Sequence, residues 1–305
     1  MIMLRFTLIC LLVVSSLVYA EDPEAISLLG KPLFPPALSD DVMNQFEANL
    51  AVARAEFEKN PADPEALIWL GRRTAYPGRY KEAIAIYTRG VEKYPENPKF
   101  LRHRGHRYLT IREIDKAIGD FEKAVLLIEG KPDEIEPDGL PNAKNIPTST
   151  LKTNIWYHLG LAYYLRGDFE QAERAYRECL KHSKNDDMLT ATTHWYYMTL
   201  MRQGKKEEAQ SLLEPIKAEM NIIEDFDYHS LVLMYKGLKT SDSILNPDQI
   251  KDLSGATIAY GVGNRYIYTG EKDKGLALFR RIIETNEWAA FGYLAAEADL
   301  ARSSK

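Results

Sequence analysis

A repeat of 34 residues constrains the fold of this chain more than any other feature of its sequence. Two consecutive units run from Pro64 to Lys131, and residues of similar character recur at an offset of 34. The matching pairs are Leu67 and Leu101, Gly71 and Gly105, Thr74 and Tyr108, Ala83 and Ala117, Tyr87 and Phe121, and Gly90 and Ala124. Such a period predicts one supersecondary unit per repeat, stacked on its neighbours into an array.

The spacing inside a unit predicts two helices. Large apolar residues at positions 4, 7 and 11, with a small residue at position 8, form a stripe on one face of a first helix. A second helix carries alanine at position 20, an aromatic residue at 24 and a small residue at 27. Small residues allow two helices to approach closely, and the aromatic ring fills the space beside them. We therefore expect antiparallel helix pairs.

The unit from Thr153 to Asp186 resembles the tetratricopeptide repeat family, whose pattern is W-x2-L-G-x2-Y followed by A-x3-F and a small residue. Its matching residues are Trp156, Leu159, Gly160, Tyr163, Ala172, Tyr176 and Cys179. The first unit matches at Leu70, Gly71, Ala83, Tyr87 and Pro95, with Leu67 at the tryptophan position. The resemblance implies an all-α, right-handed superhelical solenoid of stacked antiparallel helix pairs.

Glycine at position 15 locates the weaker units, because a helix that must reverse often ends in a left-handed residue. Glycines at 78, 167, 204 and 270 take this position, whereas the second unit has Arg112. A fourth unit follows at 190–223, where Pro215 should end the second helix early. Residues 225–237 and 246–253 are expected to be helices of a degenerate repeat. A lead helix at 41–59 and a capping helix at 288–302 complete the array.

The division that follows comprises seven segments. They are a signal peptide (1–20), a Pro-rich extended arm with the lead helix (21–60), units one and two (61–131), an acidic Pro-rich insert (132–152), units three and four (153–223), a degenerate repeat (224–255), and the last unit with the capping helix (256–305).

The N-terminus has the pattern of a secretory signal. Arg5 supplies the charge, 8–14 the apolar core, and Val18-Tyr19-Ala20 a small-residue cleavage pattern. The alternative is an uncleaved anchor, but the apolar run is shorter than the ~20 residues that a spanning helix needs. We expect an exported protein of bacterial type, periplasmic or secreted, with no transmembrane span after cleavage.

Composition narrows the function class. The chain has 305 residues, of which 45% are apolar and 27% charged, with a formal net charge of −5. These values argue against disorder and against a general nucleic-acid binder. Only Cys10 and Cys179 could pair, and Cys10 lies in the expected signal peptide, so we expect no internal disulfide and a buried thiol at Cys179.

The resemblance also implies a concave groove lined by fixed positions of the first helices. In this sequence the groove positions hold Trp69, Arg72, Tyr76, Arg102, His103, His106, Tyr157, His158, Tyr164, His194 and Trp195. Arginine holds anionic groups through paired hydrogen bonds, and aromatic rings supply contact area, so the set is typical of a binding groove. The alternative is that the rings only fill the inner curve of the superhelix.

Other chemistries have less support. His103 and His106 lie one helical turn apart, and His158 and His194 could approach them, but no HExxH motif or cysteine pair occurs. We expect no metal and no cofactor. The sequence also lacks a P-loop and a G-x-S-x-G motif, so we expect no enzymatic activity.

We therefore predict a non-catalytic scaffold that binds a protein or peptide partner in the groove. The alternative is a binding protein for a small anionic ligand or glycan. The Lys and Asn pattern by which some members of the family clamp a peptide carboxylate is absent. Its positions hold Ile68, Arg72, His103, Asn154 and His158.

The insert at 132–152 carries four prolines and an acidic run of Asp133, Glu134, Glu136 and Asp138. Its carboxylates could draw it over Arg102, His103 and His158 as a lid, with apolar help from Ile135 and Leu140. The alternative is a solvated linker. Loops of this length in compact arrays are usually functional or disordered.

Overall fold

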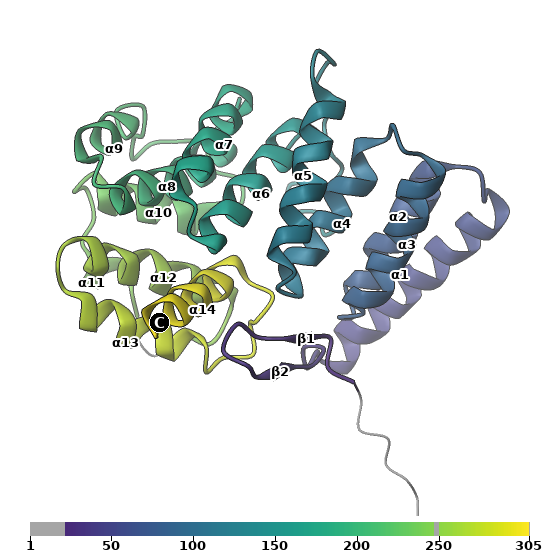
Figure 1. Cartoon of the computed structure of the whole chain (residues 1–305), viewed down its shortest axis with the longest axis horizontal. Coiled ribbons are helices and arrows are strands. Elements are labelled where there is room, and N and C mark those ends of the chain that lie inside the picture. Colours follow the sequence, from purple (N-terminus) through teal and green to yellow (C-terminus); the bar gives the residue numbers. More distant parts are fainter. Residues whose placement is uncertain (1–21, 247–249, 305) are drawn as a thin grey trace, which may run out of the picture.

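The computed structural model describes residues 22–246 and 250–304. The expected signal peptide at 1–20 lies outside the described residues. The described chain is an all-α solenoid of stacked helix pairs with one small β-hairpin (Figure 1). Within these residues, no helix combines the length and apolarity that crossing a membrane requires.

Antiparallel helix pairs make up most of the fold, and each pair packs on the next (Figure 1). The paired helices are α2 (Pro64–Ala75) with α3 (Tyr80–Lys93), α4 (Pro98–Thr110) with α5 (Ile114–Ile128), α6 (Leu151–Arg166) with α7 (Phe169–His182), α8 (Asp186–Arg202) with α9 (Lys206–Leu212), and α12 (Leu253–Tyr268) with α13 (Lys272–Ile282). The remaining helices are α1 (Asp40–Lys59), α10 (Phe226–Tyr235), α11 (Ser241–Ile244) and α14 (Phe291–Ser303). α1 covers α2, and α10 packs between α8 and α12.

The helices start where the sequence supplies caps. The side chains of Asp63 and Asn97 accept hydrogen bonds from the backbone, each directly before a proline at the first helical position. Thr150 and Thr153 form a reciprocal capping box that starts α6. α9 ends at Leu212, three residues before Pro215, as the proline predicts.

The small residue at position 8 packs directly on the aromatic ring at position 24. A Cβ atom added to Gly160 would lie 2.7 Å from Cε1 of Tyr176, and one added to Gly71 would lie 2.4 Å from the same atom of Tyr87. Gly105 and Gly263 face Phe121 and Phe279 in the same way. In these four pairs the helices cross so closely that a side chain at position 8 would overlap the aromatic ring.

A β-hairpin at the N-terminus ties the two ends of the solenoid together. Its strands, β1 (Ala25–Ile26) and β2 (Pro32–Leu33), pair antiparallel with Ala25 opposite Leu33. The backbone N–H of Leu28 donates to Glu297 of α14 at 2.5 Å, and the indole of Trp288 donates to the carbonyl of Phe34 at 2.7 Å. The expected extended arm is thus fixed against the C-terminal helix (Figure 1).

One helix starts later than expected, and another expected helix falls partly outside the described residues. α14 begins at Phe291, after Trp288, because Trp288 lies in the preceding turn with its indole held by the hairpin. The helix expected at 246–253 includes 247–249, which lie outside the described residues. Before this segment, a short helix occupies Ser241–Ile244, where Thr240 and Ser243 form a capping box.

Candidate functional site

The insert lies on the groove positions of the second unit. The carboxylate of Glu136 is 3.0 Å from Nη2 of Arg102, and it accepts a hydrogen bond of 3.1 Å from the amide of Asn154. Glu136 and Arg102 are both buried, so each compensates the desolvated charge of the other. Burial and the neighbouring Arg102 hold the pKa of His103 well below its usual range, so this imidazole is neutral.

The insert also covers the first unit. Arg73 donates a hydrogen bond of 2.9 Å to the carbonyl of Gly139, and Gly139 packs against the hydroxyl of Tyr76. The guanidinium of Arg72 lies 4.3 Å from the ring centroid of Trp69. A β-bridge closes the base of the insert, with the backbone N–H of Glu136 donating to Ser149 at 3.2 Å. These contacts fix the insert over the expected groove.

Polar contacts, rather than the expected apolar ones, hold the insert. Ile135 and Leu140 are 68% and 57% exposed, so the prediction that their apolar contacts hold the insert is wrong. Glu136 is buried instead, because Arg102 and Asn154 satisfy its two carboxylate oxygens.

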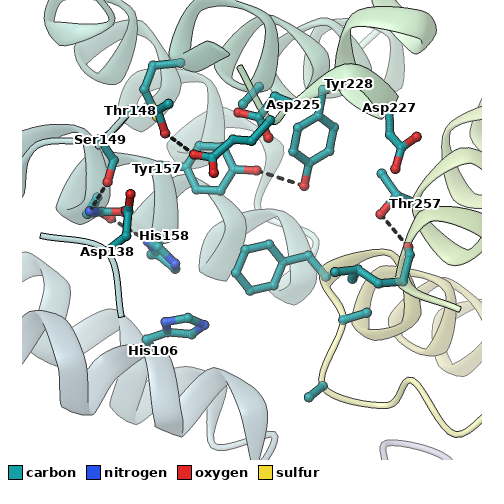
Figure 2. Close-up of a pocket in the computed structure, with 18 residues that line it drawn as sticks. His106, Asp138, Thr148, Ser149, Tyr157, His158, Asp225, Asp227, Tyr228 and Thr257 are labelled. Atoms are coloured by element: carbon teal, nitrogen blue, oxygen red, sulfur yellow. Dashed lines mark hydrogen bonds between the residues drawn. The ribbon is translucent and has the colours of Figure 1, made fainter. Parts of the chain in front are cut away.

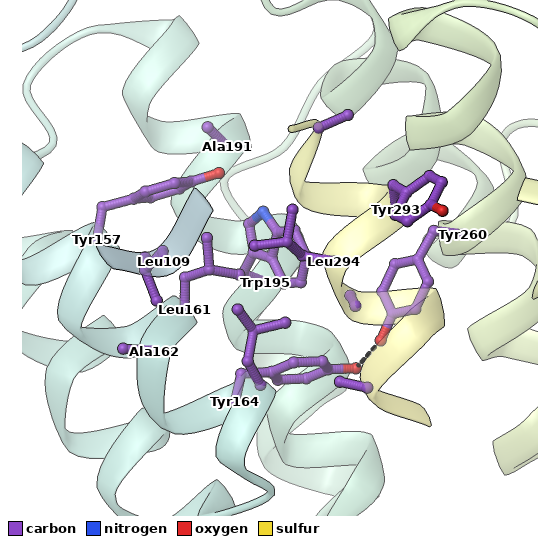
Figure 3. Close-up of a cluster of buried hydrophobic side chains, with 14 of the residues drawn as sticks. Leu109, Tyr157, Leu161, Ala162, Tyr164, Ala191, Trp195, Tyr260, Tyr293 and Leu294 are labelled. Carbon is purple, nitrogen blue, oxygen red and sulfur yellow. Dashed lines mark hydrogen bonds between the residues drawn. The ribbon is translucent and has the colours of Figure 1, made fainter. Parts of the chain in front are cut away.

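The C-terminal half of the expected groove is filled by α14. Tyr164, Trp195 and His194 are at most 1% exposed and belong to the core, so they line no open surface. Figure 3 shows Leu294 of α14 among Trp195, Tyr164 and Leu161. The hydroxyl of Tyr260 lies 2.8 Å from that of Tyr164 and 3.0 Å from a carboxylate oxygen of Asp299. Tyr164 and Trp195 therefore pack the C-terminal helices, whereas His194 packs against Tyr228 and Tyr235 of α10.

A pocket of about 470 Å³ remains between the insert and α14. Its walls come from α4, the insert, α6, α8, α10, α12 and the start of α14. Of the expected groove residues it keeps His106, Tyr157 and His158 (Figure 2). Four acidic residues also line it: Asp138, Glu224, Asp225 and Asp227. No lysine or arginine lines it among the residues that the structure describes.

Aromatic rings form the floor of this pocket. The hydroxyl of Tyr157 donates to that of Tyr228 at 3.3 Å. The ring centroid of Phe291 lies 6.3 Å from that of Tyr157 and 5.5 Å from that of His158. The ring centroids of His106 and His158 are 4.5 Å apart. In Figure 2 the two histidines lie on the opposite side of the pocket from Asp227 and Thr257.

The pocket histidines are uncharged at neutral pH. Burial, with Arg102 as the next cause, lowers the pKa of His158 to about 3, and burial with Arg107 holds the pKa of His106 well below its usual range. Nδ1 of His158 lies 2.6 Å from the carbonyl of Asn154, which fits an N–H at that position.

A buried carboxylate positions the acidic side of the pocket. Asp187, fully buried in α8, accepts hydrogen bonds from the backbone N–H groups of Ile223, Glu224 and Asp225 at 2.8–3.0 Å. Burial raises the pKa of Asp225 to about 8, and the nearby charges of Asp187, Glu224 and Asp227 add to this effect. Burial, followed by Glu224, also raises the pKa of Asp138.

The model of the tetratricopeptide repeat family matches residues 153–186, the segment that forms α6 and α7. This segment is a tetratricopeptide repeat. A search of curated protein sequences gives no significant match.

Solved structures of low sequence identity resemble this chain. One is a tetratricopeptide repeat protein from Parabacteroides merdae, 18% identical, covering 80% of this chain and 89% of its own, with a TM-score of 0.47. YrrB, described as a TPR protein with an unusual peptide-binding site, is 16% identical over 76% of this chain and 91% of its own, with a TM-score of 0.44. BtubC from P. vanneervenii is 14% identical over 88% and 92%, with a TM-score of 0.45.

Repeat positions alone do not reveal most of the residues that line the pocket. Glu224, Asp225, Asp227 and Tyr228 lie in or beside the degenerate repeat, where no motif position assigns them to a face. The available signal is local: three acids are interspersed with two aromatic residues between Glu224 and Tyr228. What it could not reveal is that α10 turns this run toward the insert.

The arrangement offers binding surface. Among the described residues, no group of three or more His, Cys, Asp or Glu side chains could hold a metal ion. Cys179 is fully buried, and burial raises the pKa of its thiol to about 12, so it is not a nucleophile at neutral pH. An open pocket with aromatic walls and fixed carboxylates is suited to recognition.

Proposed function

We propose that this protein is a non-catalytic scaffold that binds a protein or peptide partner at the pocket between the insert and α14. The observation that carries the proposal is the pocket itself. The insert and α14 occupy the rest of the expected groove, whereas this part keeps about 470 Å³ of space between aromatic and polar walls. Aromatic side chains at such a site supply contact area at low entropic cost.

The alternative, a small anionic ligand or glycan, has weaker support. Arg102 lies buried against Glu136, and the guanidinium of Arg72 lies over Trp69. The open pocket has four carboxylates and neutral histidines, and anions would be repelled there.

A pair of matched variants tests the partner proposal. Leu253 lies at the pocket and Leu238 lies outside it, and both are 58% exposed. Leu253→Trp should reduce capture of a partner from an envelope extract by about tenfold or more, whereas Leu238→Trp should leave capture unchanged. Partners are to be identified by mass spectrometry after confirming by circular dichroism that both variants fold. Equal capture by both variants would exclude this pocket as the partner site.

We also propose that the mature chain acts outside the cytoplasm. The leader pattern of residues 1–20 supports this proposal. N-terminal sequencing of the protein recovered from cell fractions tests it, with Glu21 expected as the first residue and an intact Met1 as the contrary result.

A further inference from the structure

The pocket has an unbalanced charge. Asp138, Glu224, Asp225 and Asp227 come from two separate segments, the insert and the start of α10, and converge on one cavity. Neighbouring carboxylates repel one another, and in the described part of the chain no lysine or arginine lines the cavity to compensate them. The neutral imidazoles of His106 and His158 add no positive charge at neutral pH.

One acceptor in this cavity is left without a donor. Oδ2 of Asp138 is buried and has no hydrogen-bond partner in the described residues. Buried acceptors in native proteins nearly always have a partner, so this oxygen leaves the acidic wall of the cavity incompletely compensated. Glu224 differs, because its carboxylate already accepts hydrogen bonds from Thr148 and Asn142.

Aromatic rings lie beside the carboxylates. Tyr157 and Tyr228, joined through their hydroxyls, and Phe291 give the pocket faces on which an aliphatic chain or a cation can pack. A cation over an aromatic face is attracted by the electrons of the ring, and more strongly where the cation is desolvated. Long basic side chains suit such a wall, because an apolar stem carries the charged end.

We propose that the pocket receives a basic side chain, lysine or arginine, of the partner protein. The proposal rests on the scaffold function above and names the chemistry of its ligand. The stem packs on Tyr157 and Tyr228, and the charged end donates hydrogen bonds to Asp138 and Asp225. Asp187, which holds the backbone at Asp225, is a positioning residue.

The pH dependence of binding separates this arrangement from a merely apolar pocket. Asp225 faces Asp187, Glu224 and Asp227, and its pKa is about 8, so much of this carboxyl is protonated at pH 7. A bound cation favours the ionised form and displaces the proton. Affinity for a lysine peptide therefore rises between pH 6 and 9, a range in which lysine itself stays charged.

Blocked heptapeptides that differ only at the central residue test the proposal. With lysine, arginine, norleucine or glutamate in a glycine and alanine background, they are titrated into the ¹⁵N-labelled full chain at low salt. Lysine and arginine peptides should shift the amides of Asp138, Asp225 and Tyr228 and bind about tenfold or more tightly than norleucine, since hydrogen bonds to charged groups are stronger than neutral contacts. Equal binding of norleucine overturns the proposal.

Variants and competing cations complete the test. Asp225→Asn should weaken lysine-peptide binding about tenfold and remove its dependence on pH, whereas Asp273→Asn, an exposed acid in the first turn of α13, should have no effect. Binding of spermidine or Ca²⁺ without binding of the lysine peptide overturns the proposal in favour of a small cation. Partner capture that is lost in Leu253→Trp but intact in Asp225→Asn leaves the scaffold function standing and overturns the basic side chain alone.

Discussion

Arg112 and Glu297 form a buried ion pair that joins the second repeat to the C-terminal helix. Nη2 of Arg112 lies 2.8 Å from Oε2 of Glu297, and the two side chains are 4% and 1% exposed. The same guanidinium donates a hydrogen bond of 2.9 Å to the carbonyl of Trp288. Arg112 adopts φ +70°, and the glycines at the equivalent turns have φ between +75° and +94°. Arg112 therefore adopts a strained backbone conformation in this turn, and its side chain makes a long-range contact that glycine could not make.

Arg112→Gly should destabilise the fold by about 2–4 kcal/mol. Glycine relieves about 1 kcal/mol of left-handed strain, but breaking a buried pair costs ~3–5 kcal/mol because Glu297 is left uncompensated. Urea unfolding measures the difference. The double variant Arg112→Gly with Glu297→Gln should lose less unfolding free energy than the two single variants lose in total. A variant as stable as the wild type would show that the pair contributes no more than the backbone strain that glycine relieves.

Gly160→Ala should destabilise the third repeat by about 1–3 kcal/mol, because its new Cβ would overlap the ring of Tyr176. Gly119 is the matched control. It lies exposed in α5, and a Cβ there would meet no atom within 4 Å. Gly119→Ala should therefore stabilise the protein by about 0.5–1 kcal/mol. Thermal and urea unfolding test both, and a loss in Gly119→Ala would contradict the steric explanation.

The sequence predicts the repeats well because their determinants are local. Gly160 and Tyr176 lie in the two helices of one pair, and the turn glycine Gly167 lies between them, so spacing alone indicates their contact. Contacts across the array leave no such period. Nothing near Arg112 indicates Glu297, 185 residues away, and the repeat positions of Tyr164 and Trp195 are the same whether or not α14 fills the groove.

The insert was predicted only in part, for the same reason. Its acids and the neighbouring Arg102 indicate that it could fold back, but local sequence does not say which carboxylate is buried. The buried carboxylate is that of Glu136, because the amide of Asn154 supplies it with a second hydrogen-bond donor. Glu224 and Asp225 are held at the site because their backbone N–H groups donate hydrogen bonds to Asp187, and no sequence motif indicates these bonds.

Glu136→Gln should loosen the insert. The variant leaves the buried Arg102 without its counter-charge, which destabilises the docked position by several kcal/mol in the range ~3–5 kcal/mol measured for broken buried pairs. Hydrogen exchange of the amides at 134–140 should then become markedly faster. Glu134→Gln is the control, because Glu134 pairs with Lys99 at the surface, where a pair contributes only ~0–1 kcal/mol. Unchanged protection in Glu136→Gln would mean that this pair does not hold the insert.

His194 should make the protein less stable in acid. Burial lowers the pKa of His194 to about 3, and the imidazole lies against the hydroxyl of Tyr235 at 3.2 Å and the rings of Trp195 and Tyr228. The unfolded chain, with a pKa near 6.5, binds a proton that the folded chain does not. The stabilisation from this group is therefore complete above about pH 6.5 and is lost as the pH falls toward 3, by up to ~1.4 kcal/mol per pH unit.

His194→Gln should flatten the acid side of the stability curve by about one proton. Glutamine keeps an acceptor for Tyr235 but does not titrate, so the slope of unfolding free energy between pH 6 and 4 should fall by up to ~1.4 kcal/mol per unit. His103, His106 and His158, whose pKa values are also lowered by burial, retain the remaining slope. His229→Gln, a partly exposed histidine hydrogen-bonded to the carbonyl of Lys217, is the control. Urea titrations from pH 4 to 7 measure the slopes, and equal slopes in both variants would mean that His194 is accessible to protons in the folded state.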